Sequence, residues 1–374
     1  MSHRLFAAIG ALAIILAFML LAQVTAVAQQ KAPAAAPAVK QAPKTPVKPA
    51  AKPCTVPKTA WGDPDIQGVY TFSTPTPLER PNTQAHKDTL TEAELAEQSE
   101  QLTSGFKDEG NELCIGGRCR PRQEGDVGFY NNFWTSSEQG RLTGRTSLIL
   151  EPENGRKPAL TEQAQKARDQ LVKEAAERRV TIGSVQHTLY DSWTDHPAYT
   201  RCLARPMPRI GQSYNHGLEI LQTPGTVVIH YESLHDVRII PLDKSPHIDS
   251  SIRQWNGDSR GHWEGNTLVI DWTNFTDKQE FQGQPQGNMH FIERLTKVDA
   301  NTIRYEVTVE DPTTWTAPWK FLTLWRGDDP VYRKAEDLYE YACHEGNYRM
   351  MEDSLLGTRA VKETGKQPES GSKK

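Results

Sequence analysis

The feature that most constrains the fold is a series of short strand-like segments that occupies the chain from Leu218 onward. Apolar and polar residues alternate within them, and turn sequences such as Pro224-Gly225 separate them. Turns this tight join antiparallel neighbours, so the pattern favours a barrel or sandwich over an open α/β sheet. The predicted strands are Leu218–Gln222, Thr226–Leu234, Val237–Leu242, Gly261–Trp263, Thr267–Thr273, Met289–Val298, Thr302–Glu310, Trp319–Trp325 and Leu338–Cys343.

The sequence therefore predicts a mainly β fold, an antiparallel β-barrel or sandwich of lipocalin-like type, with one or two helices and long loops. An opening strand is predicted within Asp65–Phe72, where a Gly-x-aromatic core is similar to the first strand of lipocalins. One helix is predicted over Leu90–Gln101, with Thr91 as its cap and Glu94 three residues later. A second is predicted over Thr161–Arg179, which lacks Gly and Pro.

The N-terminal region predicts export. Arg4 precedes an apolar run of 18 residues, Leu5–Ala22, and small residues follow up to Ala28. Residues 1–28 are read as a signal peptide, with a retained anchor as the alternative because the run is long enough for a thinned bilayer. We expect a Pro/Ala/Lys-rich linker over 29–57, a single β-rich domain over 58–361 and a tail over 362–374. The location is periplasmic or secreted, with no stable membrane insertion after cleavage.

The net charge of −4 hides an asymmetry. Six of the 43 basic residues and none of the 47 acidic residues lie in the first 57 positions, so the remainder of the chain carries a net charge near −10. A domain of this sign repels phosphate backbones, so a nucleic-acid partner is not expected.

Export makes disulfide bonds the default interpretation of the cysteines. Cys114 and Cys119 flank a glycine-rich turn short enough for their sulfurs to meet. Cys202 and Cys343 would then pair across the domain, leaving Cys54 in the linker. A catalytic thiol is the alternative for these residues.

A carboxylate on an apolar strand face is the main candidate for chemistry. Residues two apart in a strand share a face, so Glu293 lies among the apolar residues of Met289–Val298. On the next strand the apolar face contains Tyr305, which we expect near Glu293. In the same way His230 and Glu232 are predicted to point inward.

If Trp272 and Asn274 join these side chains, one interior contains Glu, His, Tyr, Trp and Asn among aliphatic residues, which is typical of a small-molecule pocket. Desolvation would raise the pKa of a carboxylate there and suit it to general acid–base catalysis. The alternative is structural, with Glu293 and Glu232 each paired to an arginine such as Arg238, Arg294 or Arg304.

Several polar loops are further candidates. His235 and its neighbour Asp236 occupy a probable hairpin turn, where either a charge relay or ordinary turn chemistry would explain them. The loop from Asp258 to His262 brings an acid, a hydroxyl and Arg260 together, either as a site or as a structural network. The block Tyr130-Asn131-Asn132-Phe133-Trp134 suits a pocket wall or lid.

No cofactor or metal is predicted. His230 and Glu232 share a strand face, but no His-x-His or spaced Cys pair supports a metal site. No Gly-x-Ser-x-Gly elbow, dinucleotide fingerprint or phosphate-binding loop occurs in the sequence.

Several sequence blocks resemble those of a widespread family of exported bacterial β-rich proteins. The likeness extends over Asp65–Tyr348 and implies export and a β-rich body, but it brings no established catalytic residues. The blocks are Tyr130–Trp134, Arg145–Ile149, His235–Asp243, Ser251–Trp255 with Gly257–Gly261, Trp263–Gly265, Asp311–Trp315 and Tyr341–Asn347.

The leading hypothesis is an exported, cofactor-independent enzyme, a lyase or isomerase, that acts on a small apolar or aromatic molecule. The alternatives are a non-catalytic lipocalin-like carrier of a hydrophobic ligand and a structural protein of the envelope. The predicted catalytic residues are Glu293 or Glu232 as base, Tyr305 or His230 as acid, and His235. The predicted substrate-binding residues are Tyr130, Asn131, Trp134, Arg145, Arg238, Asp258, Arg260, Trp272 and Asn274.

Overall fold

The computed structural model describes residues 55–104, 112–115, 118–121, 141–182, 185–211, 215–328 and 338–364. All of them belong to the second of two units into which the chain divides, Met1–Lys52 and Pro53–Lys374. The predicted signal peptide and the block with Tyr130, Asn131 and Trp134 lie outside the described residues, so those interpretations stay predictions.

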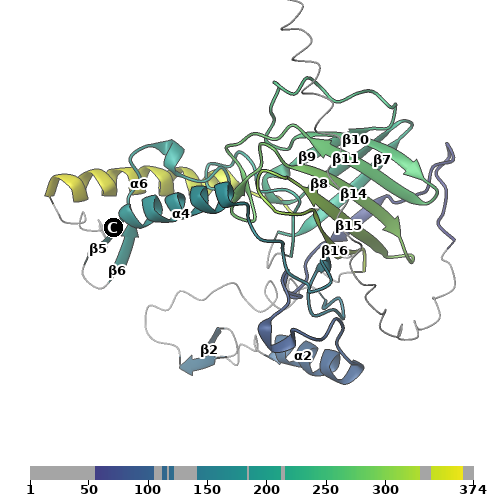
Figure 1. Cartoon of the computed structure of the whole chain (residues 1–374), viewed down its shortest axis with the longest axis horizontal. Helices are drawn as coiled ribbons and strands as arrows, with labels where there is room; N and C mark the ends of the chain where they lie inside the picture. Colours follow the sequence, from purple (N-terminus) through teal and green to yellow (C-terminus); the bar gives the residue numbers. More distant parts are fainter. Residues whose placement is uncertain are drawn as a thin grey trace, which may run out of the picture. The chain divides into compact units, whose positions relative to one another are not determined.

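One ten-stranded sheet forms the body of the described unit (Figure 1), and its neighbouring strands are antiparallel. The strand order is β10-β11-β14-β15-β16-β1-β7-β8-β9, with β4 paired to β16. The strands are β1 (Gly68–Thr71), β4 (Ile149–Glu151), β7 (Gly217–Thr223), β8 (Thr226–Tyr231), β9 (Val237–Pro241), β10 (Asp258–Glu264), β11 (Thr267–Thr273), β14 (His290–Lys297), β15 (Thr302–Glu310) and β16 (Trp319–Arg326).

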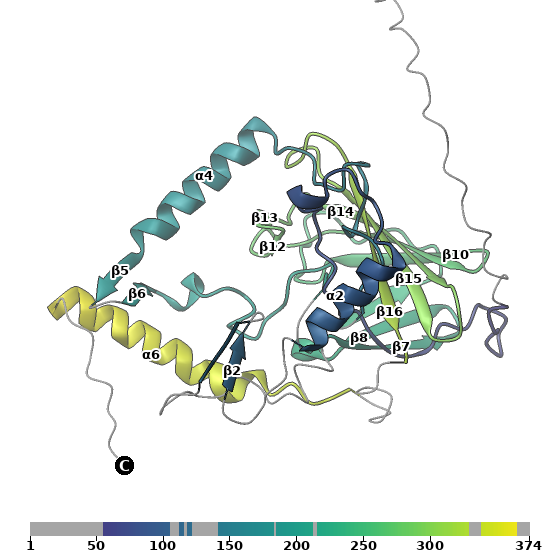
Figure 2. The same ribbon diagram turned by 90° about the horizontal axis from the view of Figure 1, so that it is seen from below.

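The sheet curls so that its two end strands, β9 and β10, lie side by side (Figure 1). Figure 2 shows the same sheet from below. No ladder hydrogen bonds join these two strands within the described residues. They meet through side chains instead, because a Cβ added at Gly261 would lie 2.7 Å from both Ile240 Cγ2 and Leu242 Cδ2. The predicted mainly β, antiparallel, barrel-like class is therefore confirmed, with a seam in place of full closure.

Strict alternation along the central strands fills the interior of the curled sheet. On β14 the residues Phe291, Glu293 and Leu295 are buried, and on β15 so are Tyr305 and Val307, as the period-two pattern predicts. Large aromatic side chains occupy most of this interior. The fully buried ones are Trp272, Trp319, Trp325, Tyr231, Tyr305, Phe72, Phe275, Phe291 and Phe321.

The prediction for β8 is wrong in two respects. The strand ends at Tyr231, before Glu232, because the backbone turns into the short 3-10 segment η3 (Ser233–His235), where Leu234 and His235 adopt positive φ. Its inward face carries Val227, Ile229 and Tyr231, so His230 points outward. Both faces of this segment are rich in apolar residues, and alternation alone therefore does not say which one is buried.

Three α-helices lie within the described residues. Two match the predicted helices, and the Thr91–Glu94 capping box is present. The third begins at Cys343, so the predicted strand Leu338–Cys343 is wrong: six residues are too few for periodicity to distinguish a strand from the approach to a helix. The helices are α2 (Glu92–Ser104), α4 (Glu162–Glu177) and α6 (Cys343–Thr364).

Short elements connect these parts. The remaining ones are the hairpins β2 (Glu112–Ile115) with β3 (Arg118–Pro121), β5 (Arg179–Ile182) with β6 (Val185–Thr188) and β12 (Glu280–Phe281) with β13 (Gln284–Pro285), and the 3-10 segments η1 (Asn82–Gln84) and η2 (Trp193–Asp195).

The predicted bridge between Cys202 and Cys343 is confirmed, and it ties the segment after η2 to the first residue of α6. Cys114 is opposite Cys119 in the β2–β3 register, but their side chains lie outside the described structure, so that bridge stays a prediction. Within the described residues, every helix is too short or too polar to cross a bilayer.

Candidate functional site

A buried ion pair occupies the interior of the curled sheet where the sequence predicts a reactive carboxylate. Arg238 Nη1 donates to Glu293 Oε1 at 3.1 Å, and Nη2 donates to Oε2 at 2.6 Å. The Tyr305 hydroxyl also donates to Oε1, and Arg238 Nη2 donates to Ser259 Oγ at 3.1 Å. The guanidinium carbon lies 3.4 Å from the ring centroid of Trp272. The predicted meeting of Glu293 with Tyr305 is thus confirmed.

This arrangement holds both charges in place and leaves Glu293 little freedom to react. Glu293 is 0% exposed and Arg238 3% exposed, and both carboxylate oxygens already accept hydrogen bonds. Burial by itself lowers the pKa of Arg238, but the attraction of Glu293 raises it above its usual value. Burial, reinforced by the charge of Glu293, raises the pKa of Tyr305. The geometry matches the structural alternative, a carboxylate paired with arginine.

The other predicted catalytic residues lie elsewhere. Glu232 is buried at the end of the β7–β8 pair, where its Oε1 accepts from Asn215 Nδ2 at 2.8 Å and its Oε2 from Gly217 N at 3.3 Å. His230 faces outward, with Nδ1 3.9 Å from Glu219 Oε2. His235 lies in η3, with its ring 6.4 Å from that of His230.

Two predicted ligand-binding residues support backbone instead. Arg145 is half-buried, and its Nε donates to Ser147 O at 3.2 Å. Burial lowers the pKa of this guanidinium. Asn274 follows β11 and donates through Nδ2 to Ile248 O at 2.9 Å. Their contacts in the structure are therefore those of loop supports.

A chain of alternating carboxylates and imidazoles crosses the outer face of β10, β11, β14 and β15. His247 Nδ1 pairs with Asp258 Oδ2 at 2.6 Å and its Nε2 with Asp271 Oδ1 at 2.8 Å. His290 Nε2 pairs with Asp271 Oδ2 at 3.1 Å and its Nδ1 with Glu310 Oε2 at 2.9 Å. Both nitrogens of each ring are therefore occupied.

The carboxylates and imidazoles of this outer-face chain shift one another's pKa values. Hydrogen bonds to Asp271 and Glu310 raise the pKa of His290, and the hydrogen bond from His290 lowers the pKa of Asp271. Arg260, which was predicted to bind substrate, donates through Nη1 to Asp258 Oδ1 at 2.7 Å and so belongs to the same network. Since every imidazole nitrogen has a carboxylate partner, the chain is suited to holding four strands together electrostatically.

An aromatic cleft of about 690 Å³ lies beside the sheet, between the segment that follows η2 and the loop before β12. Its walls combine aromatic and apolar side chains with a few polar groups, which is the usual composition of a small-molecule site. The Cys202–Cys343 bridge attaches to the segment that forms one wall, between the lining residues Arg201 and Leu203. The aromatic, charged and amide side chains of its walls include Trp193, His196, Tyr199, Arg201, Trp255, Lys278 and Gln279.

His196 is the titratable side chain in this cleft with the most distinctive environment. Its ring stacks on Tyr190 with centroids 4.0 Å apart, and Nε2 lies 2.9 Å from Ser354 Oγ on α6. The Ser354 hydroxyl donates to Met351 O at 2.8 Å, so its single proton is used and Nε2–H donates to Oγ. The lone pair of the neutral ring is then on Nδ1, which has no hydrogen-bond partner among the described residues.

Burial favours the neutral form of this imidazole. Desolvation lowers the pKa of His196, outweighing the opposing attraction of Asp195. Gln279, 3% exposed, lines the same cleft: Nε2 donates to Arg205 O at 3.0 Å, and Oε1 has no partner within the described structure. A neutral base, an unpaired acceptor and the cations of Arg201 and Lys278 thus surround one space.

The sequence did not predict the aromatic cleft or the chain of carboxylates and imidazoles on the outer face of the sheet. The cleft is assembled from η2 and the segment after it, the loop around Trp255 and the segment that leads into β12, which are far apart in the chain and mostly irregular. The one local signal is the density of aromatic and imidazole side chains between Tyr190 and Tyr199, just before Cys202.

Comparisons with known proteins add little. No protein-family model and no curated protein matches the chain. Among solved structures, a crystal structure of a mutant of the fluorescent protein UnaG matches with 16% sequence identity and a TM-score of 0.19, over 34% of this chain and 84% of that chain. At this TM-score the match carries no information on function.

Proposed function

We propose that this chain is an exported enzyme that performs cofactor-independent acid–base chemistry, of the lyase or isomerase type, on a small aromatic or apolar molecule bound in the aromatic cleft. The observation that supports this most is His196, an imidazole whose neutral form is favoured by burial and whose Nδ1 has no hydrogen-bond partner among the described residues, beside a space of about 690 Å³. A general base needs this combination of a free lone pair, a suitable pKa and room for a substrate.

In this proposal Nδ1 takes a proton from a carbon atom of the ligand that lies next to a carbonyl group. The imidazolium that results has Asp195 beside it, whose charge favours the protonated ring, and Ser354 Oγ continues to accept from Nε2–H. The same ring then returns the proton to another atom of the ligand. Arg201 and Lys278 provide positive charge for the oxygen of the intermediate.

The ligand class follows from the walls of the cleft. Trp193, Tyr199 and Trp255 offer flat apolar surfaces on which an aromatic ring packs favourably. Export rests on the apolar leader and on the resemblance to exported proteins, and the Cys202–Cys343 bridge is compatible with it. The acidic domain gives no reason to propose a nucleic-acid partner.

Deuterium exchange tests the proposal directly. The full chain is incubated with phenylacetone in D2O, and loss of the protons next to the carbonyl is followed by NMR. We expect the wild-type protein to accelerate exchange and His196→Gln to lose at least about 100-fold of that acceleration. His230→Gln, an imidazole on the outer face of β8, serves as the matched control and should keep it.

Two outcomes would contradict the proposal. Undiminished exchange in His196→Gln would remove the assigned base. Binding of phenylacetone without any acceleration of exchange would favour the alternative function, a carrier that uses the same cleft.

A further inference from the structure

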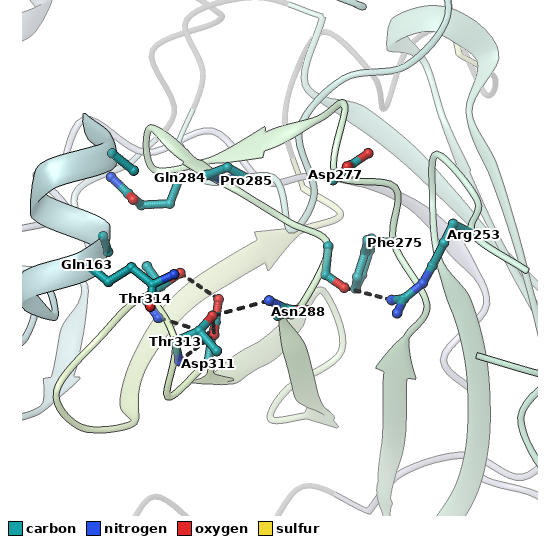
Figure 3. Close-up of a pocket in the computed structure, with 13 residues that line it drawn as sticks. Gln163, Arg253, Phe275, Asp277, Gln284, Pro285, Asn288, Asp311, Thr313 and Thr314 are labelled. Carbon is teal, nitrogen blue, oxygen red and sulfur yellow. Dashed lines mark hydrogen bonds between the residues drawn. The ribbon is translucent and has the colours of Figure 1, made fainter. Parts of the chain in front are cut away.

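A second cleft, of about 530 Å³, lies at the end of the sheet where β14 begins and β15 ends (Figure 3). The first turns of α4 form one side, and β13 forms another. It shares no lining residue with the aromatic cleft described above. Figure 3 shows Asp311, Thr313 and Thr314 together on one side of the space, with Arg253 across from them.

One wall is a loop that carries hydroxyl groups and is held together by hydrogen bonds to Asp311. Asp311 is buried, and its carboxylate accepts from Thr313 N at 2.9 Å, Thr313 Oγ1 at 2.6 Å, Thr314 N at 3.2 Å and Thr314 Oγ1 at 2.6 Å. Asn288 Nδ2 donates to Thr313 Oγ1 at 3.3 Å. The negative charge of Asp311 is thus engaged inside the loop, and the cleft presents amide and hydroxyl groups.

The opposite wall contains an amide that lacks a protein partner. Gln284 is 5% exposed, it lines the cleft, and its side chain makes no hydrogen bond within the described residues. It extends toward the helix that carries Gln163 (Figure 3). The Gln284 amide stays accessible to water from the cleft, so a polar ligand in this space would replace water as its hydrogen-bond partner.

The rest of the cleft is apolar or balanced in charge. The exposed Pro285 contributes an apolar surface, and Ala167 on α4 leaves room beside the helix. Arg253 is held over the space by a hydrogen bond from Nη1 to Gly287 O at 2.7 Å, and Asp277 supplies the opposite charge. A ligand without net charge fits this balance.

We infer that this cleft binds a neutral saccharide. Each sugar hydroxyl both donates and accepts a hydrogen bond, as do the amides of Gln284 and Asn288, and a sugar ring has an apolar C–H face that suits Pro285. These features of the cleft fit a ligand that has a compact ring with polar groups along one edge. This site is independent of the acid–base function proposed for the aromatic cleft.

Saturation-transfer NMR with the full chain tests the assignment, using cellobiose, maltose and chitobiose as probes and trialanine as a peptide probe. We expect transfer to at least one disaccharide and none to trialanine. Gln284→Leu removes the unpaired amide and Ala167→Phe fills the space from the exposed side of α4, and each should weaken disaccharide binding roughly tenfold or more.

Gln170→Leu, which removes an exposed amide elsewhere on α4, is the matched control and should leave binding unchanged. Far-ultraviolet circular dichroism verifies that each variant is folded, and Ala167→Phe keeps the test decisive if Gln284→Leu does not fold. No transfer to any disaccharide, transfer to trialanine instead, or unchanged affinity in Ala167→Phe would overturn the inference. None of these readouts depends on activity at His196.

Discussion

The interior ion pair and the aromatic cleft both place ionisable side chains in apolar surroundings, yet they differ in what remains unpaired. Both oxygens of Glu293 accept hydrogen bonds, and its side chain is fully enclosed. His196 has one nitrogen paired with Ser354 and one without a partner among the described residues, beside about 690 Å³ of space.

The comparison teaches that burial of a polar group does not by itself indicate a reactive site. A carboxylate that is paired and hydrogen-bonded contributes to the specificity of the core. Removing one member of the ion pair leaves the other charge buried without a partner, which destabilises the fold. A base with a free lone pair next to a cavity is available to a ligand. The predictions below separate these two roles, beginning with the largest expected effect.

Breaking the interior pair should have the greatest effect on stability. Arg238→Met leaves Glu293 buried with Tyr305 as its only remaining donor among the contacts described, and we expect a loss of about 3–5 kcal/mol in the free energy of unfolding. Urea unfolding measures it. The double variant Arg238→Met with Glu293→Leu should recover much of the loss, because no unpaired charge remains. A single variant within about 1 kcal/mol of wild type would contradict a structural role.

Removing the bridge should have the next largest effect. Cys202 and Cys343 are separated by 141 positions, so Cys202→Ser frees a long loop in the unfolded chain and should lower the free energy of unfolding by about 2–5 kcal/mol. The same change loosens the anchor of the segment that lines the aromatic cleft, so phenylacetone binding should weaken as well. Chemical denaturation and ligand titration of the same preparation measure both. Unaltered binding would show that the cleft does not depend on this anchor.

The pH dependence of exchange should follow His196. Its pKa is lowered by burial, so Nδ1 stays unprotonated until the pH falls below the usual range for histidine, and exchange should decline only there. The lowered pKa of His196 also makes stability depend on pH. Below the unfolded-state pKa near 6.5 the unfolded chain binds the proton more readily than the folded chain. The free energy of unfolding therefore falls as the pH drops through the folded-state pKa. A pH–rate profile of phenylacetone exchange measures the first effect, and a profile that declines already near or above pH 6.5 would contradict it.

Titration of His290, in the outer-face chain of carboxylates and imidazoles, should have the smallest effect on stability. Its pH dependence has the opposite sign to that of His196. The pKa of His290 is raised, so its contribution to stability is fully present below the unfolded-state value near 6.5 and is lost as pH rises through the folded-state value. Since 34% of its side chain is exposed, solvent screening keeps the effect within about 1 kcal/mol. Unfolding of His290→Gln across this range should lack that pH-dependent step. If His290→Gln shows a pH-dependent change in stability of equal size, that change belongs to another titratable group.

Much of the β body was predictable from the sequence because local alternation determines it. The limits of β11 and β15 agree with the predicted strands, and the approach of Tyr305 to Glu293 followed from their shared faces. The face of β8 was not predictable, since Val228 and Ile229 are both apolar and only tertiary packing selects one. α6 was not predicted because the six residues of Leu338–Cys343 are too few for periodicity to distinguish a strand from the approach to a helix.

The candidate sites depended on contacts that no local pattern encodes. His196 acquires its properties from Ser354, more than 150 positions away, and His247 from Asp258 and Asp271 on two different strands. Gln284 is distinctive only because its amide has no partner in the described structure. Such features arise from loops brought together by the sheet, and sequence spacing carries no signal for them.

Indole NMR signals offer the most direct test of the central claim, that the ligand site is the aromatic cleft and the interior is a packed core. The indole N–H resonances of the full chain are recorded while phenylacetone is added. We predict that the signals of Trp193 and Trp255, which line the cleft, shift with increasing ligand, and that those of Trp272 and Trp325, buried in the interior, do not. Shifts confined to Trp272 and Trp325 would place the ligand inside the curled sheet and contradict the account.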